Sequence, residues 1–130
     1  MTPQRELTSK RPTNYSSWHR TKLPEWCYQT DGDWFEQRKV DGKLVVVAYI
    51  ETIEVLPLFI NNAQREYSLW PSKRALIVDI YNRMRVSCFI VRHTADCKTF
   101  CVSRVTLTGD ETEAILMNET EYITWMQNLR

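Results

Sequence analysis

The acidic side chains that could carry out chemistry gather around one predicted β-hairpin. Asp31 and Asp33 precede or open its first strand, and Glu51 and Glu54 follow an apolar second strand at residues 44–50. Carboxylate oxygens are ligands for Mg²⁺ and Mn²⁺, and a metal held by them can lower the pKa of a water molecule that attacks a phosphodiester. The pattern therefore suggests metal-assisted hydrolysis, and the alternative is a set of solvated strand ends.

The length of the hairpin loop decides whether these carboxylates converge. A slip of one residue turns every side chain of a strand to the opposite face of the sheet. A two-residue loop at 41–42 leaves Asp33 facing away from Glu51, whereas a three-residue loop at 40–42 places Asp31, Asp33 and Glu51 on one face. The Asp-Gly dipeptide in this loop favours two residues, so turn preference alone argues against an assembled site.

The elements around the hairpin are typical of one α/β (α+β) domain. The run at 44–50 is apolar and β-branched, as in a central strand that is covered on both faces. Capping and periodicity predict helices at residues 15–22, 71–84 and 119–129, a helical turn at 24–28, and strands at 86–92 and 99–107. We expect a mixed, mainly antiparallel sheet of about four to five strands flanked by helices.

Charge and composition point to a globular domain at residues 13–130 that follows a flexible basic arm at residues 1–12. The chain has 17 basic and 16 acidic side chains and a net charge of +1, so it has no strong overall field for nucleic acid. The basic arm, together with Arg20, Lys22 and Arg74 near exposed aromatic residues, is the predicted source of contacts to DNA.

The chain has no apolar run of the roughly 20 residues that a membrane span requires. Its polar first residues do not resemble a secretory signal. We therefore expect a cytoplasmic protein with no membrane partner. The same setting predicts that the four cysteines are free, buried thiols; a zinc site built from His93, Cys97 and Cys101 with a fourth ligand is the less favoured alternative.

The arrangement of Asp33, the hairpin and Glu51, flanked by helices, resembles the PD-(D/E)XK nuclease-like superfamily. This superfamily includes restriction endonucleases and archaeal Holliday-junction resolvases. The likeness covers roughly residues 15–92 and implies a restriction-endonuclease-like αβββαβ core. It also implies that Asp33 and Glu51 are metal ligands, with Asp31 as an additional candidate, for Mg²⁺ or Mn²⁺.

The chain departs from the family pattern at Ile53, which stands two positions after Glu51 where the motif has lysine. Some members of the superfamily place that lysine on a neighbouring element. Lys73 or Arg74, at the start of the helix predicted at 71–84, could take this role. Lys73 is the candidate catalytic lysine; without such a substitute the resemblance implies a degenerate copy that binds but does not cleave.

Three functional hypotheses follow from these features. The first is a Mg²⁺-dependent nuclease that hydrolyses DNA phosphodiester bonds, or a degenerate copy of one. The second is a non-catalytic module that binds nucleic acid or protein through the sheet, the basic arm and exposed aromatic side chains. The third is a structural or assembly protein. A homodimer is compatible with each of them.

Overall fold

A mixed sheet whose strand order follows the chain from β1 to β7 forms the centre of the computed structural model, which describes residues 6–7, 14–30 and 35–129. Only the β1–β2 and β4–β5 pairs of this described sheet are parallel. The predicted class, a mixed and mainly antiparallel sheet with flanking helices, is confirmed, and β1 and β7 extend the sheet at its edges. The strands are β1 Glu6–Leu7, β2 Cys27–Thr30, β3 Phe35–Val40, β4 Lys43–Val55, β5 Ser87–Thr94, β6 Thr99–Arg104 and β7 Ile115–Asn118.

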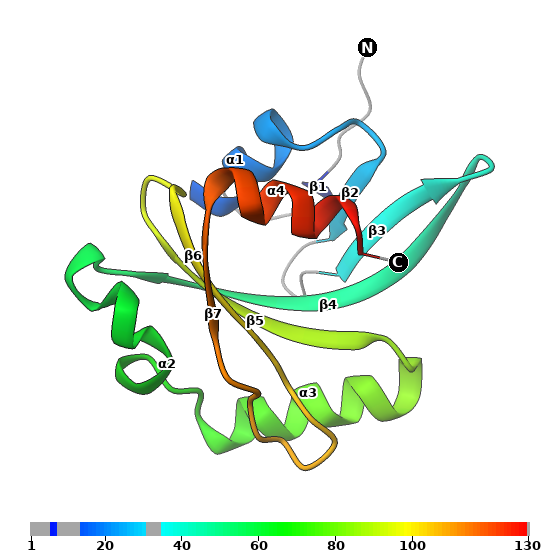
Figure 1. The fold of residues 1–130 in the computed structure, drawn as a ribbon. Helices are drawn as coiled ribbons and strands as arrows, with labels where there is room; N and C mark the ends of the chain where they lie inside the picture. Colours follow the sequence, from blue (N-terminus) through cyan, green and yellow to red (C-terminus); the bar gives the residue numbers. More distant parts are fainter. Residues whose placement is uncertain (1–5, 8–13, 31–34, 130) are drawn as a thin grey trace.

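Helices cover both faces of the sheet. Figure 1 shows α1 (Asn14–Lys22) and α4 (Glu119–Gln127) on one face and α3 (Pro71–Met84) on the other. The short helices η1 (Pro57–Asn62) and α2 (Ala63–Glu66) connect β4 to α3. The three helices predicted from periodicity and capping are therefore present close to their expected bounds.

Two buried clusters hold the layers together. The α1 and α4 side includes Ile50, Phe100 and Tyr122, and the α3 side includes Tyr49 and Ile77. Tyr49 and Ile50 are neighbours on β4 and point to opposite faces, as the alternation of a strand requires. The residues of β4 with odd numbers between 49 and 53 therefore face α3.

The connection from β4 to β5 is a crossover through α3, because parallel neighbours cannot be joined by a tight turn. Pro71 opens α3 at a position where its missing N–H is tolerated. Arg85 ends the helix in the left-handed conformation, with a φ of 59°. This crossover carries the first turn of α3 past the sheet face that holds Glu51.

The hairpin loop has the two residues Asp41 and Gly42, with φ angles of 50° and 79°, as a type I′ turn requires. The alternative of a three-residue loop is wrong. A β-bulge then leaves Val47 without a partner, and beyond it Phe35 pairs with Tyr49. This extra residue shifts the pairing of the two strands by one position. The loop length alone therefore does not determine which residues share a face at the far end of the hairpin.

Two local predictions are wrong. The helical turn expected at 24–28 is a turn followed by β2, since the backbone of residues 27–30 pairs with β3. The strand at 44–50 is not covered on both faces along its length: Leu44 and Val45 are each 44% exposed. Figure 1 shows the reason, because the tip of the β3–β4 hairpin extends beyond the helices.

Several expectations fall on residues outside the described ranges. Within the predicted arm at 1–12, the structure describes only Glu6–Leu7, which pairs with β2. Asp31 and Asp33 lie outside the described residues. No helix in the described part of the chain is long and apolar enough to span a membrane.

Candidate functional site

Glu51 and Lys73 form an ion pair between β4 and α3. The Lys73 Nζ lies 3.4 Å from the Glu51 Oε1, and the Tyr49 hydroxyl donates a hydrogen bond of 2.7 Å to the other carboxylate oxygen, Oε2. The Glu51 side chain is 13% exposed and that of Lys73 is 38% exposed. These two contacts hold a carboxylate in one orientation beside a cation at the edge of the core.

The positions of these side chains follow from the local structure. Tyr49, Glu51 and Ile53 alternate with residues that face α1 and α4, so all three face α3. Lys73 lies in the first turn of α3, and the crossover brings this turn against β4. The sequence analysis named both Glu51 and Lys73, and the structure brings them together.

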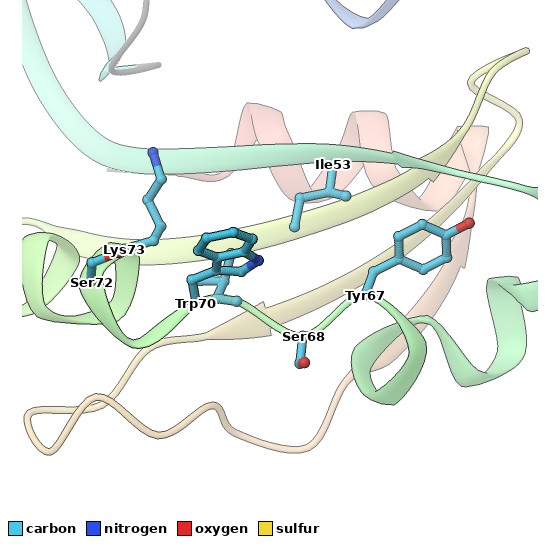
Figure 2. Close-up of a pocket in the computed structure, with 7 residues that line it drawn as sticks. Ile53, Tyr67, Ser68, Trp70, Ser72 and Lys73 are labelled. Atoms are coloured by element: carbon cyan, nitrogen blue, oxygen red, sulfur yellow. The ribbon is translucent and has the colours of Figure 1, made fainter.

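A groove of about 370 Å³ extends from Lys73, in the first turn of α3, along the segment 67–70 that precedes the helix. Figure 2 shows Trp70 between Lys73 and Tyr67, with Ile53 of β4 opposite them. Ile53, at the position where the resemblance expects a lysine, contributes an apolar side chain to the groove. The residues that line it are Ile53, Tyr67, Ser68, Leu69, Trp70, Ser72 and Lys73.

The other predicted nucleic-acid contacts lie elsewhere. Arg74 donates hydrogen bonds to the Gly109 carbonyl and to Glu111, at 2.9 Å each, and so contacts the segment between β6 and β7. Arg20 and Lys22 are exposed on α1, which lies on the opposite face of the sheet from Lys73. The sheet therefore separates these two cations from the Glu51–Lys73 pair.

The structure contains a buried ion pair that the sequence analysis missed. Arg92 on β5 is fully buried; its Nη1 lies 2.6 Å from Glu111 Oε1, and its Nε donates to the Tyr67 carbonyl. Ser103 donates a further hydrogen bond of 2.6 Å to the same Glu111 oxygen. This cluster fixes the 105–114 segment and one wall of the groove. An arginine that ends the apolar run 86–91 is the signal that could have revealed it.

The charge of Glu111 depends on this cluster. Burial by itself raises the pKa of the Glu111 carboxyl, but hydrogen bonds from Arg92 and Ser103 and the positive charges of Arg92 and Arg74 outweigh it, so the pKa is lowered. Glu111 is therefore the ionised partner of two arginines. Its contacts are internal, which indicates a structural role.

A second buried cluster lies under α1. Glu36 Oε1 is 2.8 Å from His19 Nε2 and 2.6 Å from Arg38 Nη1, and Arg38 also donates to the Met126 carbonyl. The Glu36 Oε2 and Arg38 Nε atoms have no hydrogen-bond partner among the described residues. The cluster joins α1, β3 and α4 on the sheet face opposite to Glu51.

All four cysteines are free and buried, as predicted. His93 Nδ1 lies 2.9 Å from the Thr94 carbonyl and 3.7 Å from the Cys97 sulfur. Burial lowers the pKa of His93 against the opposing effects of Thr94 and Glu54, and burial raises the pKa of Cys97 to about 11. The Cys97 thiol is therefore a poor nucleophile at neutral pH. In the described part of the chain, no three His, Cys, Asp or Glu side chains are grouped to hold a metal.

Comparison with protein families, curated proteins and solved structures found no match to this chain. The functional interpretation therefore depends on the Glu51–Lys73 pair, the adjoining groove and the order of the elements.

Proposed function

We propose that this protein is a metal-dependent nuclease that hydrolyses DNA phosphodiester bonds, with Glu51 as a metal ligand and Lys73 in the role of the missing motif lysine. The observation that carries the proposal is the distance of 3.4 Å between the Lys73 Nζ and the Glu51 carboxylate. Ile53 cannot supply a cation, and Lys73 brings one to the same carboxylate from a neighbouring helix. The resemblance to the PD-(D/E)XK superfamily anticipates such a replacement.

The order of the elements also supports the proposal. A helix, α1, precedes the three antiparallel strands β2, β3 and β4, and α3 then leads to β5, which is parallel to β4. This order agrees with the αβββαβ core that the resemblance implies. We therefore include a restriction-endonuclease-like fold in the proposal.

The donor set is compatible with Mg²⁺ or Mn²⁺. Magnesium is often held by one or two carboxylates together with substrate phosphates and water, and Glu51 supplies one such carboxylate. The proposal requires a second carboxylate from Asp33 or Asp31, which lie outside the described residues. A bound metal would activate water and neutralise phosphate charge.

Lys73 and Tyr49 have distinct roles in this proposal. The Lys73 ammonium stabilises negative charge on a phosphate oxygen next to Glu51. The Tyr49 hydroxyl, through its hydrogen bond to Glu51 Oε2, orients the carboxylate. Tyr49 is therefore a positioning residue, whereas Glu51 and Lys73 contact the metal or the substrate.

Cleavage of plasmid DNA with Mg²⁺ or Mn²⁺ tests the proposal. We expect Glu51→Gln and Lys73→Met each to slow cleavage by about 100-fold or more, because the first removes a metal ligand and the second removes positive charge that stabilises the transition state. Glu54→Gln is the matched control: Glu54 lies on the same strand but accepts a hydrogen bond from Asn14 on the opposite face. Equal cleavage by wild type and Glu51→Gln would overturn the proposal.

A lysine at position 53 provides a second test. In the Lys73→Met background, Ile53→Lys places an ammonium at the position of the family motif, on the same strand face as Glu51. We expect it to restore cleavage by about tenfold or more over Lys73→Met alone. A similar gain from lysine at position 52, on the other face of β4, would contradict the assigned geometry.

The second candidate function is a non-catalytic module that binds nucleic acid. Ile53 favours it, because the position of the motif lysine holds an apolar side chain. In this case wild type does not cleave DNA with any divalent metal, and Lys73→Met weakens DNA binding. The plasmid assay and a binding assay together separate the two candidates.

A further inference from the structure

Trp70 exposes an aromatic ring beside the proposed site. It is 78% exposed, although the transfer of large aromatic side chains out of water is strongly favourable. Its ring lies between Lys73 and Tyr67 in the groove (Figure 2). The groove thus combines a flat apolar surface with a cation at one end.

The backbone of the groove is held in place by internal hydrogen bonds. The Trp70 carbonyl accepts hydrogen bonds from the Lys73 and Arg74 N–H groups, at 3.0 and 3.1 Å. The Tyr67 carbonyl accepts from the buried Arg92, and the Tyr67 hydroxyl accepts from the Leu56 N–H. A ligand would therefore meet a preorganised surface, which reduces the entropy cost of binding.

Trp70 is the extended N-cap residue of α3 and Lys73 lies in the first turn of the helix, and both side chains line the groove. A ligand that contacts both needs a flat apolar ring joined to an anion. A nucleotide has both parts, since its base can stack on indole and its phosphate can pair with an ammonium. The chemistry of the groove is therefore complementary to a nucleotide.

We propose that the groove binds an unpaired base of DNA, stacked on Trp70, next to the phosphate at the Glu51–Lys73 pair. This inference rests on the proposed nuclease function, because that function places the phosphate. Bases inside a duplex are covered on both faces by their neighbours and cannot stack on a side chain unless they leave the helix. The groove therefore selects single-stranded or unpaired DNA as the substrate class.

Fluorescence anisotropy with a labelled single strand of about 12 nucleotides, and with the duplex of the same sequence, tests this inference. EDTA prevents cleavage during the measurement. Trp70→Ala should weaken binding of the single strand by about 5- to 100-fold, and Trp70→Phe should retain it within about threefold. Binding of the duplex should change by less than about twofold.

Two further variants make the test specific. Trp70→Leu keeps an apolar side chain but has no flat ring, so it should lose about as much affinity as Trp70→Ala. Trp26→Ala removes another exposed tryptophan, which lies in a different groove beside the end of α4, and should bind as wild type does. Wild-type affinity in Trp70→Ala or Trp70→Leu, or an equal loss in Trp26→Ala, would overturn the inference.

Failure of the base-binding site and failure of the nuclease proposal give different experimental results. If Glu51→Gln abolishes cleavage while Trp70→Ala binds single strands normally, the base site is wrong and the nuclease proposal stands. If no variant or wild-type protein cleaves DNA but Trp70→Ala binds single strands weakly, the base site stands and catalysis is wrong. If Trp70→Ala instead changes only the oligomeric state in sedimentation, the groove binds a second copy and the inference is overturned.

Discussion

Two of the charged pairs on the α3 side of the sheet, Glu51–Lys73 and Arg92–Glu111, differ in what they can do. Glu51 and Lys73 remain partly exposed beside a groove, so a substrate can reach them. Arg92 and Glu111 are buried and satisfied by internal partners, so their charges serve the fold. Exposure and the direction of the hydrogen bonds distinguish a candidate site from a structural cluster here, since each pair joins a glutamate to a basic side chain.

Removal of Arg92 should be costly for stability. Arg92→Met leaves Glu111 buried without its closest cation, and we expect the free energy of unfolding to fall by about 3–5 kcal/mol at pH 7. Arg83→Met is the control, because Arg83 pairs with Asp79 on the exposed side of α3, and it should cost less than about 1 kcal/mol. Urea denaturation measures both; equal losses would contradict the structural role of the cluster.

The difference between wild type and Arg92→Met should depend on pH. The pKa of Glu111 is lowered in the folded protein, so its ionisation stabilises the fold above the ordinary glutamate pKa of about 4.3. This contribution is lost as the pH falls below that value. Since Arg92→Met already lacks most of it, the gap between the two proteins should narrow between about pH 5 and pH 3. A constant gap would contradict this assignment.

At the scale of the elements, α3 has the central position in the candidate site. Its N-terminal turn presents Trp70 and Lys73 to the groove, and its other end returns the chain to β5. The hairpin contributes Glu51 through the long strand β4. The candidate site therefore depends on the packing of one helix start against one strand, and on the segment at 56–70 that connects them.

A capping box starts α4, which covers the opposite face of the sheet. The Asn118 side chain accepts a hydrogen bond of 2.8 Å from the Glu121 N–H, and the Glu121 side chain accepts one of 2.9 Å from the Asn118 N–H. Asn118→Ala should lower the free energy of unfolding by about 1 kcal/mol, and Asn118→Asp should lower it by less. Thermal unfolding measures both, and an unchanged stability in Asn118→Ala would show that the cap contributes nothing.

The whole molecule carries little net charge and divides its basic residues between two faces. With a net charge of +1, long-range attraction to DNA is weak. Arg20 and Lys22 lie on the α1 face, while Lys73 lies on the α3 face. Of these three cations, only Lys73 lies on the face where DNA at the Glu51–Lys73 pair would bind.

The salt dependence of DNA binding should reflect this division. In EDTA, the affinity for single-stranded DNA should fall with salt, and Lys73→Met should reduce the slope of log affinity against log salt by about 0.7. Lys22→Met, on the other face of the sheet, should leave the slope unchanged. A larger effect of Lys22→Met than of Lys73→Met would place the DNA on the α1 face instead.

Much of the secondary structure was predictable because its signals are local. Pro71 at a helix start, the Asp-Gly turn and the apolar periodicity of residues 119–129 each act over a few residues, and the corresponding helices and turn are present. The short strands β1, β2 and β7 were missed. Short edge strands carry weak patterns, and the pairing partner decides their conformation.

The sequence by itself named candidates: a carboxylate at Glu51, and Lys73 or Arg74 in place of the lysine that the resemblance expects where the chain has Ile53. Only the tertiary structure decided that Lys73 meets Glu51, because this contact depends on how the α3 crossover packs against β4. The tertiary structure also decided the register of the hairpin, that is, which residues of β3 and β4 lie opposite each other. The bulge at Val47 compensates for the two-residue turn, and such a bulge arises from pairing between strands, which no local pattern encodes.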